Sequence, residues 1–185
     1  FLFCLGLAIA SAFCMKWMEG DLTIDGRIVH SYPFTILGLE IFYSKQRVTD
    51  IFDMIGYDVL KILQYHLSFD FVFMAGVYPG ITALCMIARE RTGSIAMKKA
   101  LFVMGALQIV AWIADVAENS FLFYWLSYTR WNRMYELKDA VSMSEVVTDT
   151  QFAIYHGVVI IKWVIALAGL FFALAFVLRK RKPGF

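Results

Sequence analysis

Four apolar stretches constrain the fold of this chain more than any other feature of its sequence. They lie at residues 1–18, 67–88, 100–126 and 152–178. The hydrocarbon core of a bilayer is roughly 30 Å thick, and an α-helix needs about 20 residues to cross it. Charged residues make up only 17% of the chain, against about 25% in ordinary soluble domains. We therefore expect an all-α transmembrane protein, a four-helix membrane bundle in which residues 1–185 form a single four-span domain.

The first stretch also contains an Ala-Ser-Ala motif at residues 10–12, of the kind found at signal-peptide cleavage sites. A secretory signal opens with a basic region, whereas no lysine or arginine precedes this motif. We therefore expect the first stretch to be a transmembrane helix.

The charge of the connections predicts the orientation of these spans. Lysine and arginine exceed acidic residues at residues 89–99 and 179–185, and such an excess marks the cytoplasmic side. Residues 19–66 and 127–151 carry more acidic than basic residues and should form a cap on the outer side. We expect both termini in the cytoplasm and a location in the bacterial inner membrane.

Charge also bears on the partners of the protein. A net charge of +2 is too small to attract nucleic acid, so we expect no nucleic-acid partner. Membrane lipids are the expected partners, with a larger membrane complex or a homo-oligomer as open alternatives.

The first outer connection shows a helical pattern between residues 48 and 63, where apolar residues recur at steps of three and four. We expect an amphipathic helix there, with Ser44 as its N-cap and Gly56 as a weak point. Its apolar face should lie on the bilayer surface or on the outer mouth of the bundle, or else bind a partner protein. Replacing Phe52 on that face should lower stability, whereas a change at Asp53 should do little.

The rest of the cap gives weaker signals. Residues 20–38 contain Asp25-Gly26 between short β-branched runs, which indicates a small hairpin. Residues 127–151 are expected to form a short amphipathic helix around residues 137–146.

Six polar residues interrupt or border the last three stretches. They are Asp70, Asp115, Glu118, Asn119, His156 and Lys162. A charge at the centre of a span costs roughly 2.5–3.5 kcal/mol, so these residues need partners or a purpose. Counting 1.5 Å per residue from the expected outer ends places Glu118, Asp115 and Lys162 about 12, 16 and 15 Å deep. We expect Lys162 to be charged and paired with Asp115 or Glu118.

Two interpretations of this cluster remain open. In the structural one, the lysine neutralises one carboxylate and the cluster sets the register of the helices. In the functional one, a polar pocket open to the outer side binds a ligand, an ion or a lipid headgroup, or relays protons. A metal site from Asp70, Glu118 and His156 lacks the usual ligand spacing, so we expect no metal. Haem between His66 and His156 would be poorly buried, and the sequence identifies no cofactor.

Small residues in the second stretch suggest a helix-packing site. Gly76 and Gly80 form a small-xxx-small pair, which permits close approach of another helix. Pro79 lies between them and should kink the helix. Packing within the bundle and dimerisation both fit this pattern.

A resemblance to a known family rests on three short motifs and the helix that precedes them. These are Asp70-Phe71-Val72-Phe73, Asp115-x-x-Glu118-Asn119, Lys162 and the helix of residues 40–56. They resemble a family of small uncharacterised bacterial four-span integral membrane proteins. The resemblance implies that the polar cluster is a feature of the family and implies no activity.

Two functions from different classes follow from these expectations. The first is a non-catalytic membrane protein, either an accessory subunit or a module that binds a lipid or small ligand in the polar pocket. The second is a small membrane-embedded enzyme or a proton-coupled carrier that uses the intramembrane carboxylates and Lys162. We favour the first, because many carriers are built from internal repeats and this chain has four spans without one.

Overall fold

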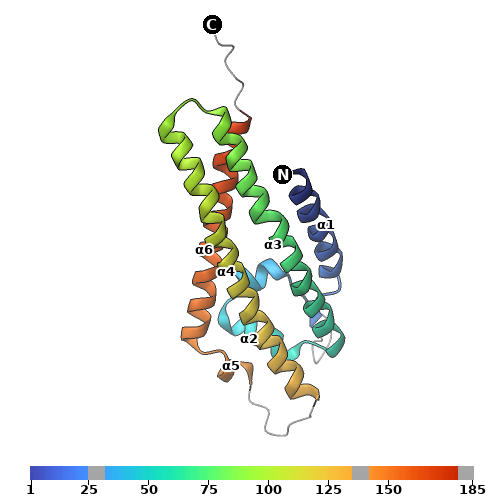
Figure 1. Ribbon diagram of the computed structural model, residues 1–185. Coiled ribbons are helices and arrows are strands. Elements are labelled where there is room, and N and C mark those ends of the chain that lie inside the picture. The colour runs from blue at the N-terminus through green and yellow to red at the C-terminus, as the bar shows by residue number, and fades with distance from the viewer. Residues whose placement is uncertain (25–31, 135–141, 179–185) are drawn as a thin grey trace.

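The computed structural model describes residues 1–24, 32–134 and 142–178. Four long helices dominate it (Figure 1), namely α1 (Leu2–Glu19), α3 (Tyr57–Arg91), α4 (Ile95–Met134) and α6 (Asp149–Val177). Each is long and apolar enough to cross a membrane. The expected all-α fold with four spans is therefore confirmed. The start of α1, the α3–α4 turn and the end of α6 lie at one end of the molecule, which we call the turn end (Figure 1).

The four helices do not contribute equally to the bundle. Helices α3, α4 and α6 pack against one another, whereas α1 packs along α3. Only Ser11 and Met15 of α1 are buried. The structure is thus a three-helix core with α1 on its flank.

Three of the helices are longer than the stretches that predicted them. With 35 and 40 residues, α3 and α4 are about 52 and 60 Å long at 1.5 Å per residue. A hydrocarbon core of roughly 30 Å is much shorter. The extra turns of α3 and α4 extend mainly toward the end opposite the turn, where α2 and α5 lie (Figure 1). We call this the cap end.

The expected amphipathic helix over residues 48–63 is not continuous, because it is divided at Gly56, its expected weak point. The chain forms α2 (Lys45–Met54), leaves the helical conformation at Ile55 and Gly56, and starts α3 at Tyr57. Glycine disfavours helix and allows this break, which lets apolar side chains from both helices reach one core. Ser44 is the N-cap of α2, as expected, and its Oγ accepts a hydrogen bond from the Arg47 amide at 3.3 Å.

The apolar face of α2 rests on the mouth of the bundle. Val48, Ile51 and Phe52 are completely buried and belong to a core shared with α3, α4 and α6. The Phe52 ring meets the Trp125 ring edge-on, with centroids 6.2 Å apart. Of the alternatives left open by the sequence, the structure selects the bundle mouth.

The remaining cap elements are short. The expected hairpin is present as β1 (Thr23–Ile24) paired antiparallel with β2 (Tyr32–Pro33), and its expected turn at Asp25-Gly26 lies outside the described residues. Helix α4 continues through residues 127–134, so the second outer connection is shorter than expected. Of the helix expected around residues 137–146, the described part holds only α5 (Met143–Val146).

Candidate functional site: a polar cluster and a pocket between α3 and α6

One face of α4 brings three polar side chains into the bundle. Asp115, Glu118 and Asn119 follow a helical spacing and are at most 3% exposed. Residues at i, i+3 and i+4 share one helix face, and in α4 this face turns toward α3 and α6. The expectation that these residues point inward is confirmed.

Lys162 of α6 lies at the centre of the cluster and is 5% exposed. Its Nζ is 2.6 Å from Glu118 Oε2 and 2.8 Å from Asp115 Oδ1. A third carboxylate, that of Glu40, approaches to 3.4 Å. The expected pairing is therefore present with both acidic residues of α4 at once, and Glu40, from the connection expected to form the cap, is a third partner.

Glu40 reaches the cluster because the chain before α2 folds back between the helices. It belongs to η1 (Gly38–Phe42), a short π-helix that packs against α6. The hydroxyl of Tyr155 donates to the Leu39 carbonyl at 3.1 Å, and Trp163 Nε1 donates to Glu40 Oε2 at 3.1 Å. The available signal was a single acidic residue within the apolar run of residues 36–42.

Two further hydrogen bonds tie α3 to this cluster. Tyr78 donates through its hydroxyl to Asp115 Oδ2 at 2.7 Å. Asn119 donates through Nδ2 to Asp70 Oδ2 at 2.6 Å. Asp70 therefore joins the cluster as expected, while the participation of Tyr78 was missed because a tyrosine in a span is no unusual residue.

The cluster holds more acidic than basic groups. Three carboxylates, those of Glu40, Asp115 and Glu118, contact the ammonium of Lys162, and a fourth, that of Asp70, joins the cluster through Asn119. Within the described part of the chain, Glu118 Oε1 is buried without a hydrogen-bond partner. A buried polar atom without a hydrogen-bond partner lowers stability. The excess of acceptors in this cluster therefore needs a physical reason.

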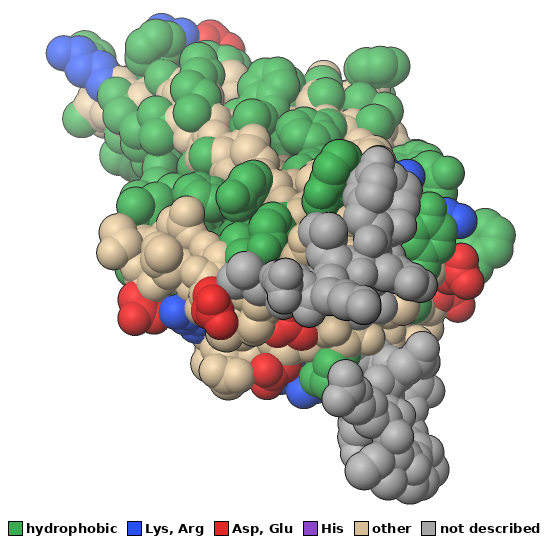
Figure 2. All heavy atoms as spheres, turned by 90° about the horizontal axis from the view of Figure 1, so that it is seen from below, with side chains coloured by type: hydrophobic (Ala, Val, Ile, Leu, Met, Phe, Trp, Pro, Cys, Tyr) green, Lys and Arg blue, Asp and Glu red, His purple; other side chains and the backbone are tan. Residues whose placement is uncertain are grey.

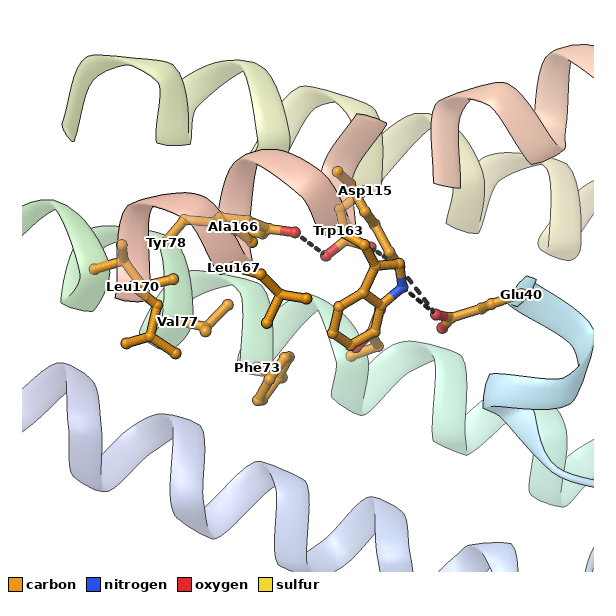
Figure 3. Close-up of a pocket in the computed structure, with 12 residues that line it drawn as sticks. Glu40, Phe73, Val77, Tyr78, Asp115, Trp163, Ala166, Leu167 and Leu170 are labelled. Atoms are coloured by element: carbon orange, nitrogen blue, oxygen red, sulfur yellow. Dashed lines mark hydrogen bonds and ion pairs between the residues drawn. The ribbon is translucent and has the colours of Figure 1, made fainter. Parts of the chain in front are cut away.

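A pocket of about 150 Å³ opens beside the cluster, between α3 and α6. Glu40, Asp70, Asp115 and Lys162 form its polar end. Its other walls are apolar, and Figure 3 shows Trp163, Leu167 and Leu170 of α6 opposite Phe73 and Val77 of α3. The pocket is thus polar at the end nearer the cap and apolar toward the turn end.

His156 does not join the other candidate residues. Its ring stacks on Phe152, one turn earlier on α6, with centroids 6.1 Å apart. No hydrogen bond or ion pair links it to the cluster among the residues that the structure describes. In the same residues, no group of His, Cys, Asp and Glu side chains is arranged to hold a metal ion.

Of the two glycines of α3, Gly76 serves the close packing of α1. A Cβ on Gly76 would lie 2.7 Å from the backbone nitrogen of Ala8 and 2.8 Å from the carbonyl oxygen of Cys4. A Cβ on Gly80 would meet only the Cβ of Cys4, at an ordinary 3.4 Å. Close packing within the bundle is therefore shown for Gly76, and Pro79 lies inside the continuous α3 beside it.

No family model, curated protein or solved structure matches this chain. The resemblance to small bacterial four-span membrane proteins thus stays a prediction.

Proposed function

We propose that the protein is a non-catalytic integral membrane protein of the bacterial inner membrane that binds a lipid or small ligand in the pocket between α3 and α6. The observation that carries this proposal is the pocket itself, with carboxylates and Lys162 at one end and apolar side chains along the rest. Binding sites for small molecules combine largely apolar walls with a few placed polar groups. A cluster that served only to set helix register would need no such space beside it.

The lengths of the helices support a position of the polar end of the pocket at the outer surface of the inner membrane. Arg89 lies in the last turn of α3 and Lys99 near the start of α4, both at the turn end. A span of about 20 residues counted from there ends beside Asp70 on α3 and at Asn119 on α4. The same count back from the end of α6 stops one turn before Lys162. On this placement the cluster lies at the membrane boundary, shallower than the depths counted from the cap end, and the cap stands outside the membrane.

The distribution of charge supports the orientation. Arg89, Arg91, Lys98 and Lys99 gather around the α3–α4 turn, and an excess of lysine and arginine marks the cytoplasmic side. Figure 2 shows the molecule from the cap end, where both acidic and basic side chains reach the surface. The described acidic residues at this end include Asp50, Asp53, Asp58, Glu145 and Asp149. Both termini are then cytoplasmic and the pocket opens in the outer half of the bundle.

Cysteine labelling tests this orientation. In a variant without the three native cysteines, a cysteine at the exposed Ser144 should react with an impermeant reagent in intact cells. A cysteine at the exposed Ser94, in the α3–α4 turn, should react only after the cells are opened. The reverse pattern would overturn the orientation.

A pocket-filling substitution tests the binding function. Ala166 lines the pocket, whereas Ala168, half a turn further along α6, is exposed. We expect the protein purified with its native lipids to carry a bound molecule in native mass spectrometry. Ala166→Trp should lose that molecule and Ala168→Trp should keep it. Equal retention by the two variants would show that the pocket is not the binding site.

The surplus of carboxylates supports a second candidate, a proton-coupled carrier or small membrane enzyme. Glu118 has no exposed surface, and its Oε1 lacks a hydrogen-bond partner among the described residues. Intramembrane carboxylates of this kind occur in proton relays. In proteoliposomes with a pH gradient, a carrier would move protons, and its Glu118→Gln variant would not. A binding module would move no protons, either as the wild type or as Glu118→Gln.

A further inference from the structure

A second cavity continues the pocket toward the turn end. It holds about 280 Å³ and lies between α1, α3 and α6, lined by residues such as Cys4, Gly80, Leu84 and Leu174. Val77, Ile81 and Leu170 line both cavities, so the two are neighbours with shared walls. The described lining of the second cavity contains no charged residue. We call the two neighbouring cavities together the α1–α3–α6 groove, and its charged lining residues all lie at the end beside the cluster.

The length of this groove is close to half the thickness of a hydrocarbon core. From Trp163 to Leu174 along α6, 11 residues cover about 16 Å at 1.5 Å per residue. Half of a hydrocarbon core of roughly 30 Å is about 15 Å. On the placement above, in which the span of α6 starts about one turn before Lys162, the apolar part begins below the outer surface of the membrane and extends past the bilayer midplane.

At the polar end of the pocket, the side-chain hydrogen-bond donors already have partners. Lys162 points its ammonium at three carboxylates, Tyr78 donates to Asp115, and Trp163 donates to Glu40. These three side chains are the donors that line the pocket within the described residues. A phosphate or carboxylate head would therefore find no free donor and would face an excess of negative charge.

Acceptors, in contrast, remain available. Asp70 accepts from Asn119 through Oδ2, and Glu40 accepts from Trp163 through Oε2. No hydrogen bond from a described residue reaches Asp70 Oδ1 or Glu40 Oε1, and both residues line the pocket. Hydrogen bonds from a cation to carboxylates are among the stronger ones, and a second positive charge would balance the surplus of acids around Lys162.

We propose that the ligand is a single-chain amphiphile with a primary ammonium head, bound with its head between Asp70 and Glu40 and its tail in the α1–α3–α6 groove. This inference rests on the proposed binding function and specifies its ligand class. The head follows from the free acceptors and the missing donors, and the tail follows from the apolar groove, which is about 16 Å long along α6.

Photo-crosslinking tests both halves of this inference. The probe is dodecylamine with a diazirine at the end of the chain, added to the protein in phosphatidylcholine nanodiscs. We expect it to label residues deep in the groove, such as Leu84 and Leu174. Unlabelled dodecylamine should compete, and dodecanoate should compete on the order of tenfold less well, because it cannot supply charge-assisted hydrogen bonds to the carboxylates. Labelling of Trp112 and Ile113, on the exposed face of α4, serves as the lipid background and should not respond to either competitor.

Paired variants test where the head and the tail of the ligand bind. The double change Glu40→Gln and Asp70→Asn should weaken competition by dodecylamine on the order of tenfold, while Asp58→Asn, at an exposed carboxylate of α3, should not. Leu170→Trp blocks the junction of the two cavities and should abolish groove labelling. Phe171→Trp places the same side chain on the exposed face of α6 and should leave labelling intact.

Failure of this inference differs from failure of the binding function. Equal competition by dodecanoate and dodecylamine would overturn the ammonium head, and labelling that survives Leu170→Trp would overturn the tail path. Either result is compatible with a bound molecule that Ala166→Trp removes. If Ala166→Trp and Ala168→Trp retain the same bound molecules and the probe labels only the exposed face of α4, the binding function itself fails.

Discussion

The two ends of the bundle are built on different principles. Toward the turn end, helices meet through small and apolar residues, and the core there includes Cys85, Leu101 and Ala173. Toward the cap end, α2, η1 and the residues that flank the strands, Leu22 and Phe34, supply apolar side chains to one core with α3, α4 and α6. The charged cluster lies where the two ends meet. A buried cluster thus has protein on its cap side and an open pocket on its apolar side, which is an arrangement suited to an amphiphilic ligand.

Removal of the central cation should have the largest effect. Lys162→Met leaves three buried carboxylates without their ammonium and should lower stability in detergent by about 3–5 kcal/mol. Adding Asp115→Asn and Glu118→Gln to it should recover part of the loss, because fewer charges are then stranded. Lys61→Met, at a half-exposed lysine of α3, should change stability by less than about 0.5 kcal/mol. Chemical denaturation monitored by tryptophan fluorescence measures all four proteins, and a harmless Lys162→Met would show that the cluster needs no cation.

The next effect concerns the cap core. Phe52→Ala removes a completely buried ring that contacts Trp125 and should cost about 3 kcal/mol. Gln46→Ala, on the exposed face of the same helix, should be almost neutral. Similar losses from the two variants would mean that α2 does not pack on the bundle.

The turn end is tested by the two glycines of α3. Gly76→Ala places a methyl group against the backbone of α1 and should cost about 1–3 kcal/mol. Gly80→Ala has room for its methyl group and should be neutral or slightly stabilising, because alanine favours helix. Disulfide trapping of α1 against α3 reports whether the contact is lost. Equal tolerance of both changes would place α1 elsewhere.

The smallest expected effect lies at the surface of the cap. Asp53 was expected to matter little, yet it accepts hydrogen bonds from the Met143 amide at 2.9 Å and from Ser142 Oγ at 3.1 Å. Asp53→Ala should cost about 1 kcal/mol and speed hydrogen exchange of the Met143 amide. Asp58→Ala, at a carboxylate that is 93% exposed, should leave this exchange rate unchanged. An unchanged rate in Asp53→Ala would mean that another group holds the start of α5.

The sequence predicts the turn end better than the cap end for a physical reason. Long apolar runs and the i, i+3, i+4 spacing of Asp115, Glu118 and Asn119 are local patterns, so the spans and the inward face of α4 are readable. The contact between Glu40 and Lys162 joins residues 122 positions apart and depends on how η1 folds back into the bundle. Hydropathy alone also cannot separate the outer turns of α3 from the helix before it, since only the break at Gly56 divides them.

The most direct test of the account is an experimental structure of the protein extracted with its native lipids. We expect elongated density that begins between Asp70 and Glu40 and passes Val77 and Leu170 toward Leu174. The Lys162 ammonium should still contact Asp115 and Glu118 in that structure. A pocket closed by its own side chains, or one that holds no elongated density, would contradict the claim that this bundle is built to bind an amphiphile.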